Sequence, residues 1–194
     1  MVTVSVTDLS ATPKRGLSPS PPSIDGLIVN ARRLAHSHWS SYSGGMELFL
    51  PDEAATQALG AAVAKVLRRG DVVCLSGPLG AGKSSLARAL IRSLTSPEEE
   101  VPSPTYTLAQ SYNGAEFPIA HFDLYRLKAP EEADELGLDE ALVAGAAVIE
   151  WPQRLGSRLP TDRLSLEITH ANDGAARTAH LSFHGAWEGR KLDV

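Results

Sequence analysis

Eight consecutive residues, GPLGAGKS from Gly77 to Ser84, combine three glycines with one lysine and one hydroxyl. They match the pattern G-x-x-x-x-G-K-[ST] in full, in which the glycines let successive backbone N–H groups point at phosphate oxygens. Lys83 is expected to reach the outer phosphates, and Ser84 to offer its hydroxyl to Mg²⁺, a cation that prefers oxygen ligands. The residues predicted to bind the nucleotide are Gly77, Leu79, Gly80, Ala81, Gly82, Lys83, Ser84 and Ser85.

Two acidic residues end apolar stretches farther along the chain: Asp123 closes FPIAHFD and Glu150 closes AAVIE. Each is predicted to lie at the carboxyl edge of a sheet, where α/β proteins bind ligands. Asp123 could hold Mg²⁺ through its waters, and Glu150 could orient the attacking water or share the metal. The predicted catalytic residues are therefore Lys83, Glu150 and Asp123, and the predicted metal ligands are Ser84, Asp123 and Glu150. For His121, packing or hydrogen bonding and a direct role both stay open.

The elements that position these residues alternate between strands and helices. A helix capped by Asp52 and closed by Gly70 precedes the buried strand that leads into the glycine loop, and a second helix is predicted from Lys83 to Leu94. Strands are also predicted at 46–50, 105–112, 117–125, 146–151, 163–170 and 176–184, with an acidic helical stretch at 130–142. This order predicts an α/β, P-loop NTPase-like fold: a mostly parallel sheet flanked by helices, with a C-terminal antiparallel hairpin turning at 172–174.

Composition divides the chain into three parts. Residues 10–23 are rich in proline and serine, so residues 1–45 are predicted to be a disordered N-terminal extension. Residues 46–185 are predicted to form a P-loop ATPase domain, and residues 186–194 a C-terminal tail. The composition break also raises the hypothesis that Met46 is the natural start, and the first residues lack the features of a signal peptide.

Net charge, cysteine content and apolar runs indicate which partners and which cellular compartment fit this chain. The formal net charge is −5, so the chain has no overall basic field that would hold nucleic acid on its own. Cys74 is the one cysteine, which fits a reducing cytoplasm. The longest uncharged apolar run, 141–149, is too short to span a bilayer, so no membrane association is expected.

The base of the nucleotide is inferred by elimination. No N-K-x-D motif for guanine follows the glycine loop, which favours ATP. A small-molecule P-loop kinase stays an alternative, because Arg154, Arg158 and Arg163 could form a lid over a transferred phosphate. The same stretch could equally be a solvated loop.

Five stretches occur in one order and spacing: SGPLGAGKSSLARAL, SPTYTLAQSY, HFDLYRL, ELGLDE and VIEWPQRL. Over residues 46–170 the chain thereby resembles the TsaE family, the ATPases of tRNA threonylcarbamoyladenosine biosynthesis. The resemblance implies a compact P-loop fold that binds and hydrolyses ATP with Mg²⁺. It also implies partners, TsaD and TsaB, which install threonylcarbamoyl on the tRNA adenosine next to the anticodon, so that contact with tRNA is indirect.

The resemblance also implies roles for single residues. Lys83 and Ser84 correspond to the glycine-loop lysine and hydroxyl, and Asp123 and Glu150 to the acids of the HxDLYR and IEW motifs. Ser103 and Thr105, in the Ser-Pro-Thr motif, resemble a switch segment near the γ-phosphate. Two departures are Pro78, where relatives often carry an acid, and the Ser84-Ser85 pair in place of threonines.

No residue is plainly an arginine finger, although Arg126 could be one or could form a surface salt bridge. Without a completed charge clamp, hydrolysis is expected to be slow for the isolated chain and faster with TsaB and TsaD.

Overall fold

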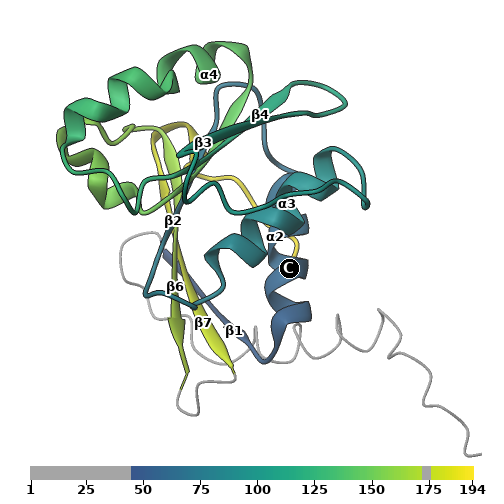
Figure 1. Cartoon of the computed structure of the whole chain (residues 1–194). Helices are drawn as coiled ribbons and strands as arrows, with labels where there is room; N and C mark the ends of the chain where they lie inside the picture. The colour runs from purple at the N-terminus through teal and green to yellow at the C-terminus, as the bar shows by residue number, and fades with distance from the viewer. Residues whose placement is uncertain (1–44, 172–175) are drawn as a thin grey trace, which may run out of the picture. The chain divides into compact units, whose positions relative to one another are not determined.

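The computed structural model describes residues 45–171 and 176–194, which form a seven-stranded sheet in the order β1-β7-β6-β2-β5-β4-β3 (Figure 1). The predicted N-terminal extension, apart from Gly45, and the predicted turn at 172–174 lie outside these residues. The strands are β1 Gly45–Leu50, β2 Val72–Ser76, β3 Ala109–Asn113, β4 Pro118–Asp123, β5 Ala146–Glu150, β6 Arg163–His170 and β7 Arg177–His184.

The sheet is parallel at its centre and antiparallel at its edges. Strands β6, β2, β5 and β4 pair in parallel, whereas β6–β7, β7–β1 and β4–β3 are antiparallel. The pairing of β6 with β7 forms the expected C-terminal hairpin. The predicted α/β fold is thus confirmed, and its parallel centre brings the ends of β2, β4 and β5 to one edge.

Helices cover both faces of this sheet. On one side, α2 (Glu53–Ala64) packs against α3 (Lys83–Leu94), and on the other lie η1 (Pro130–Leu136), α4 (Leu138–Ala144) and η2 (Pro152–Arg158) (Figure 1). Gly60 permits the close approach of α2 and α3, because a Cβ atom there would lie 2.6 Å from the carbonyl oxygen of Leu86. The central strands are therefore buried on both faces, as their continuous apolar runs predict.

Asp52 caps α2 as expected, accepting a hydrogen bond from the Ala55 amide, but the predicted end at Gly70 is wrong. The helix ends at Ala64, and the amide of Leu67 then bonds three residues back, which tightens the chain into a turn. Gly70, with φ of 84°, instead belongs to the turn that enters β2 and donates its amide hydrogen to Gly145.

The predicted strand at 105–112 begins four residues late, at Ala109. Leu108 has a φ of 64°, and its amide bonds the Pro104 carbonyl at 2.7 Å, so the preceding segment curls instead of extending. This curl brings Ser103 and Thr105 toward the end of β4.

Residues 186–194, predicted as a tail, include buried side chains. Trp187 is fully buried in the core next to β6. Arg190 forms an ion pair with Asp71 and covers the Trp187 ring. Within residues 45–171 and 176–194, no helix has both the length and the apolar character needed to cross a membrane.

Candidate nucleotide-binding site

The loop between β2 and α3 has a shape that its glycines make possible. Gly77 adopts a φ of 131°, and a Cβ atom there would lie 2.0 Å from the backbone oxygen of Ile168, so no side chain fits. Gly82 caps α3 in the left-handed region, with φ of 107° and no side-chain cap. The first amides of α3 and the positive end of its dipole thus remain available to a phosphate.

Lys83, the first residue of α3, lies almost buried against this loop, with 5% of its surface exposed. Its Nζ donates hydrogen bonds to the carbonyl oxygens of Gly77 at 2.9 Å and Pro78 at 2.8 Å, and lies 4.0 Å from the centre of the Trp151 ring. Burial lowers the pKa of Lys83, while Glu150 and Asp123 act in the opposite direction. The lysine is thus held where the glycine loop meets both predicted acids.

Glu150 ends β5 and connects the sheet to the first turn of α3. Only 2% of its surface is exposed; Oε2 accepts a hydrogen bond from Ser84 Oγ at 2.9 Å, and Oε1 lies 3.0 Å from Nε2 of His121. Two residues far apart in the chain, Ser84 and Glu150, are therefore in direct contact at the carboxyl edge of the sheet.

Asp123 ends β4 and is the register partner of Glu150 on the neighbouring strand. Its Oδ2 accepts hydrogen bonds from Thr105 Oγ1 at 2.6 Å and Ser103 Oγ at 3.1 Å, and its Oδ1 accepts one from the Tyr125 amide. Ser103 and Thr105 are also 2.8 Å apart. The predicted switch-like residues are thus attached to one of the predicted acids.

The donor set of this edge suits Mg²⁺. A hydroxyl and two carboxylates supply hard oxygen ligands, and Mg²⁺ is usually held by one or two carboxylates together with substrate phosphates and water. Over the described part of the chain, no group of three or more His, Cys, Asp or Glu residues could hold a metal ion by itself. Such a site fits a metal that is bound together with a nucleotide.

For three of the predicted nucleotide-binding residues, the structure gives an exposed side chain or a contact with another element. Leu79 is 78% exposed at the tip of the loop, and Ser85 donates a hydrogen bond to Glu53 of α2 at 3.3 Å. Ala81 is buried, and its carbonyl oxygen accepts a hydrogen bond from Arg177 Nε at 3.1 Å.

Three of the four arginines considered as finger or lid, Arg126, Arg158 and Arg163, have partners outside the glycine loop. Arg126 lies 5.1 Å from the centre of the exposed Tyr106 ring. Arg158 makes an ion pair with Asp134 and also contacts Glu131, and Arg163 donates to the Pro160 carbonyl. These contacts favour the solvated-loop interpretation of the stretch that holds Arg158 and Arg163.

Sequence reasoning missed two features of the site. Arg177, on β7, supports the glycine loop through Ala81, although nothing in its local sequence indicates that contact. Trp151 adopts a left-handed backbone with φ of 59°, and its ring meets both Lys83 and Tyr125. Its place directly after Glu150 was the available signal, but the backbone conformation could not be read from the residue type.

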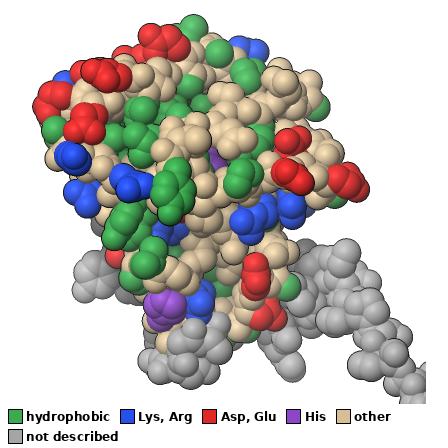
Figure 2. Space-filling view, viewed as in Figure 1, with side chains coloured by type: hydrophobic (Ala, Val, Ile, Leu, Met, Phe, Trp, Pro, Cys, Tyr) green, Lys and Arg blue, Asp and Glu red, His purple; other side chains and the backbone are tan. Residues whose placement is uncertain are grey.

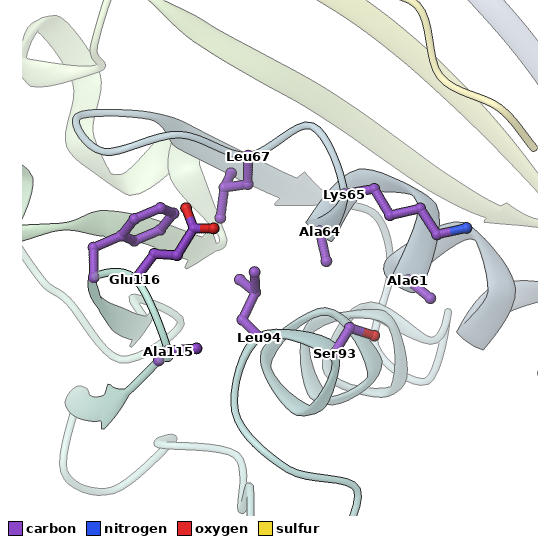
Figure 3. A pocket seen from close by; sticks show the side chains of 10 residues that line it. Ala61, Ala64, Lys65, Leu67, Ser93, Leu94, Ala115 and Glu116 are labelled. Carbon is purple, nitrogen blue, oxygen red and sulfur yellow. The ribbon is translucent and has the colours of Figure 1, made fainter.

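A cavity of about 370 Å³ lies away from these residues (Figure 3). It is lined by the C-terminal parts of α2 and α3 and by residues 114–117, so it lies at the end of α3 opposite to Lys83. None of the predicted site residues lines it. The glycine loop itself is a surface cradle of backbone amides and needs no deep hollow.

Comparison with known proteins identifies one family. The family model described as threonylcarbamoyl adenosine biosynthesis protein TsaE matches residues 50–179. The protein named tRNA threonylcarbamoyladenosine biosynthesis protein TsaE from Rickettsia felis is 39% identical over 127 residues, 64% of this chain and 74% of that protein. The protein of the same name from Streptomyces coelicolor is 40% identical over 134 residues, 67% of this chain and 90% of that protein.

A crystal structure of YdiB from Bacillus subtilis has the same fold, with a TM-score of 0.63 and 28% identity, and the match covers 76% of this chain and 90% of YdiB. The family match spans the glycine loop, both acids and the Ser103–Thr105 segment. With its parallel-centred sheet and its glycine loop between β2 and α3, the chain belongs to the TsaE family of tRNA threonylcarbamoyladenosine biosynthesis proteins.

Proposed function

We propose that this chain is a Mg²⁺-dependent ATPase of tRNA threonylcarbamoyladenosine biosynthesis, which acts in the cytoplasm together with TsaD and TsaB on the tRNA adenosine next to the anticodon. The observation that carries the proposal is the 2.9 Å contact between Ser84, at the start of the phosphate-binding helix, and Glu150, at the end of β5. It unites a hydroxyl and a carboxylate beside a buried lysine, which is the set that phosphoryl transfer from a nucleotide requires.

The proposed reaction is attack of water on the terminal phosphorus of ATP, which releases ADP and phosphate. The loop amides and Lys83 bind the phosphate oxygens and oppose the charge that develops on them. Ser84, Glu150 and Asp123 would hold Mg²⁺, which supplies further neutralisation of phosphate charge when bound. Glu150 also orients the attacking water, because it is the buried carboxylate directly beside Ser84.

The charge of the surface supports indirect contact with tRNA. Acidic side chains gather over η1 and α4, which carry Glu131, Glu132, Asp139 and Glu140 near their first turns (Figure 2). Such a surface repels a phosphate backbone, and the net charge of −5 adds to this effect. We therefore propose that TsaD and TsaB, rather than this chain, bind the tRNA.

Partners have a second proposed role, which is to raise a slow rate of hydrolysis. Arg126 is engaged with Tyr106 on the surface, so an additional positive charge at the terminal phosphate is proposed to depend on the assembly. Purified chain should release phosphate from ATP slowly with Mg²⁺, and addition of TsaB and TsaD should raise the rate. Turnover at ordinary kinase rates without partners would refute this part of the proposal.

The place in the pathway is tested in cells. Depletion of the protein should lower the amount of threonylcarbamoyladenosine in tRNA, as measured by mass spectrometry of tRNA nucleosides, and expression of the wild-type chain should restore it. The Lys83→Ala variant should not restore it. Unchanged modification after depletion would exclude the proposed function and would return attention to a small-molecule kinase, whose ADP release should depend on an acceptor.

A further inference from the structure

We propose that His121 is a positioning residue that fixes the Glu150 carboxylate for the reaction. The proposal rests on the proposed ATPase function, but it begins from a contact that is independent of it. His121 is 1% exposed, and its Nε2 lies 3.0 Å from Oε1 of Glu150, itself 2% exposed. A buried carboxylate oxygen without a donor would be unfavourable, and the histidine supplies that donor.

The topology of the sheet explains why the two side chains meet. His121 and Asp123 lie two residues apart on β4, so they point to the same face, and Asp123 is the register partner of Glu150. Neighbouring residues Ile119 and Val148 on these strands belong to the core beneath α3. The imidazole is therefore enclosed between the sheet and the helix that begins with Lys83.

The hydrogen-bond pattern assigns the proton of the ring. A carboxylate oxygen can only accept, so Nε2 must carry the hydrogen that points at Glu150. Within the described residues, Nδ1 is buried and has no hydrogen-bond partner. Because His121 has this single polar contact there, its hydrogen-bonding role is directed at Glu150.

This contact has a geometric consequence for the other oxygen of the carboxylate. Oε1 is held by His121, so Oε2 is left facing Ser84 at 2.9 Å. A contact to each of the two oxygens defines the rotation of the carboxylate, whereas one contact alone would let it turn. His121 thereby acts on the reaction through Glu150 without reaching the phosphates.

The first test replaces the ring by two amides of different reach. The amide nitrogen of His121→Gln falls near the position of Nε2, whereas that of His121→Asn falls near Nδ1 and cannot reach Glu150. In single-turnover hydrolysis with protein in excess over ATP, His121→Asn should lower the rate about tenfold or more, the effect of losing one hydrogen bond to a charged group. His121→Gln should recover most of this rate, and neither variant should change the affinity for Mg·ATP measured by calorimetry more than about threefold.

A matched control is His180, which also faces a carboxylate, Glu47, but is 46% exposed on β7. His180→Asn should leave the rate unchanged. Equal losses in the Gln and Asn variants of His121, or an equal loss in the His180 variant, would overturn the proposal. In a Glu150→Ala background, His121→Asn should add no further loss, and additive losses would also overturn it.

A second measurement needs no variant and no activity. Long-range ¹H–¹⁵N correlation spectra of the wild-type chain should show His121 with the hydrogen on Nε2, and a hydrogen on Nδ1 alone would refute the contact. If the chain bound no ATP, the proposed function would fail. The spectrum would still show whether His121 donates a hydrogen bond to Glu150. If hydrolysis occurred but the two amide variants behaved alike, the role of His121 alone would fail.

Discussion

Replacing Glu150 with glutamine keeps the volume of a buried side chain while removing its charge. The carboxylate accepts hydrogen bonds from Ser84 and His121, whereas an amide offers one oxygen and one NH₂ group. The amide oxygen can still accept from His121, and the NH₂ group can donate to the Ser84 hydroxyl, which also accepts hydrogen bonds. Because both contacts can be kept in this way, Glu150→Gln should unfold in urea within about 1 kcal/mol of the wild type.

The same substitution should affect turnover far more than binding. A carboxylate that positions water for attack contributes about 10²- to 10⁴-fold to a rate, and the amide cannot replace it in this role. The loop amides and Lys83 are unchanged, so the affinity for Mg·ATP should change by less than about tenfold. Single-turnover hydrolysis and calorimetry on the same preparations measure the two quantities.

Glu140→Gln is the matched control, since Glu140 is an exposed residue of α4 and the substitution makes the same chemical change. It should leave the rate, the affinity and the stability within error of the wild type. Equal losses of binding and turnover in Glu150→Gln would refute the reasoning, because they would make Glu150 a structural residue.

Three further predictions concern the loop, the switch-like segment and the core. Gly77→Ala places a Cβ atom 2.0 Å from a backbone oxygen, whereas the Cβ atom of Gly80→Ala meets nothing within 4 Å. Gly77→Ala should therefore lower the free energy of unfolding more than Gly80→Ala does. Equal effects of the two substitutions in urea unfolding would contradict this prediction. Thr105→Val removes the 2.6 Å hydrogen bond to Asp123 and should speed amide hydrogen exchange in residues 103–108; an unchanged rate would show that the bond does not hold the segment. Burial raises the pKa of Cys74 to about 12 from 9.0, so the unfolded chain loses this proton at lower pH than the folded chain does. The free energy of unfolding should therefore fall as pH rises from 9 toward 12, by about 1.4 kcal/mol per pH unit more steeply than in Cys74→Ala. Parallel plots of unfolding free energy against pH for the two proteins would contradict this prediction.

The residues predicted correctly from sequence are those whose positions follow from local patterns. The buried run before Gly77 and the helical spacing after Gly82 define a strand–loop–helix unit, and its helix begins at Lys83 as expected. Asp123 and Glu150 end apolar strands, and parallel pairing brings their ends together. Local pattern and topology were sufficient for this part of the site.

Long-range contacts and unusual backbone conformations could not be predicted in the same way. Arg177 reaches the loop across 96 residues of sequence, and the left-handed backbone of Trp151 and Leu108 depends on neighbours that only the folded chain supplies. Leu108 explains why β3 starts late, because its hydrogen bond to Pro104 outweighs the strand preference of the segment. The bonds from Thr105 to Asp123 follow from that curl.

Calorimetric titration of the full chain with ATP in the presence of Mg²⁺ tests the central proposal most directly. Lys83 and the loop amides should bind the triphosphate with a measurable, saturable heat, and Lys83→Ala, which removes the buried ammonium, should weaken that binding strongly and abolish hydrolysis. Absence of binding by the folded wild-type chain, or equal affinity in the Lys83→Ala variant, would contradict a nucleotide site at this loop.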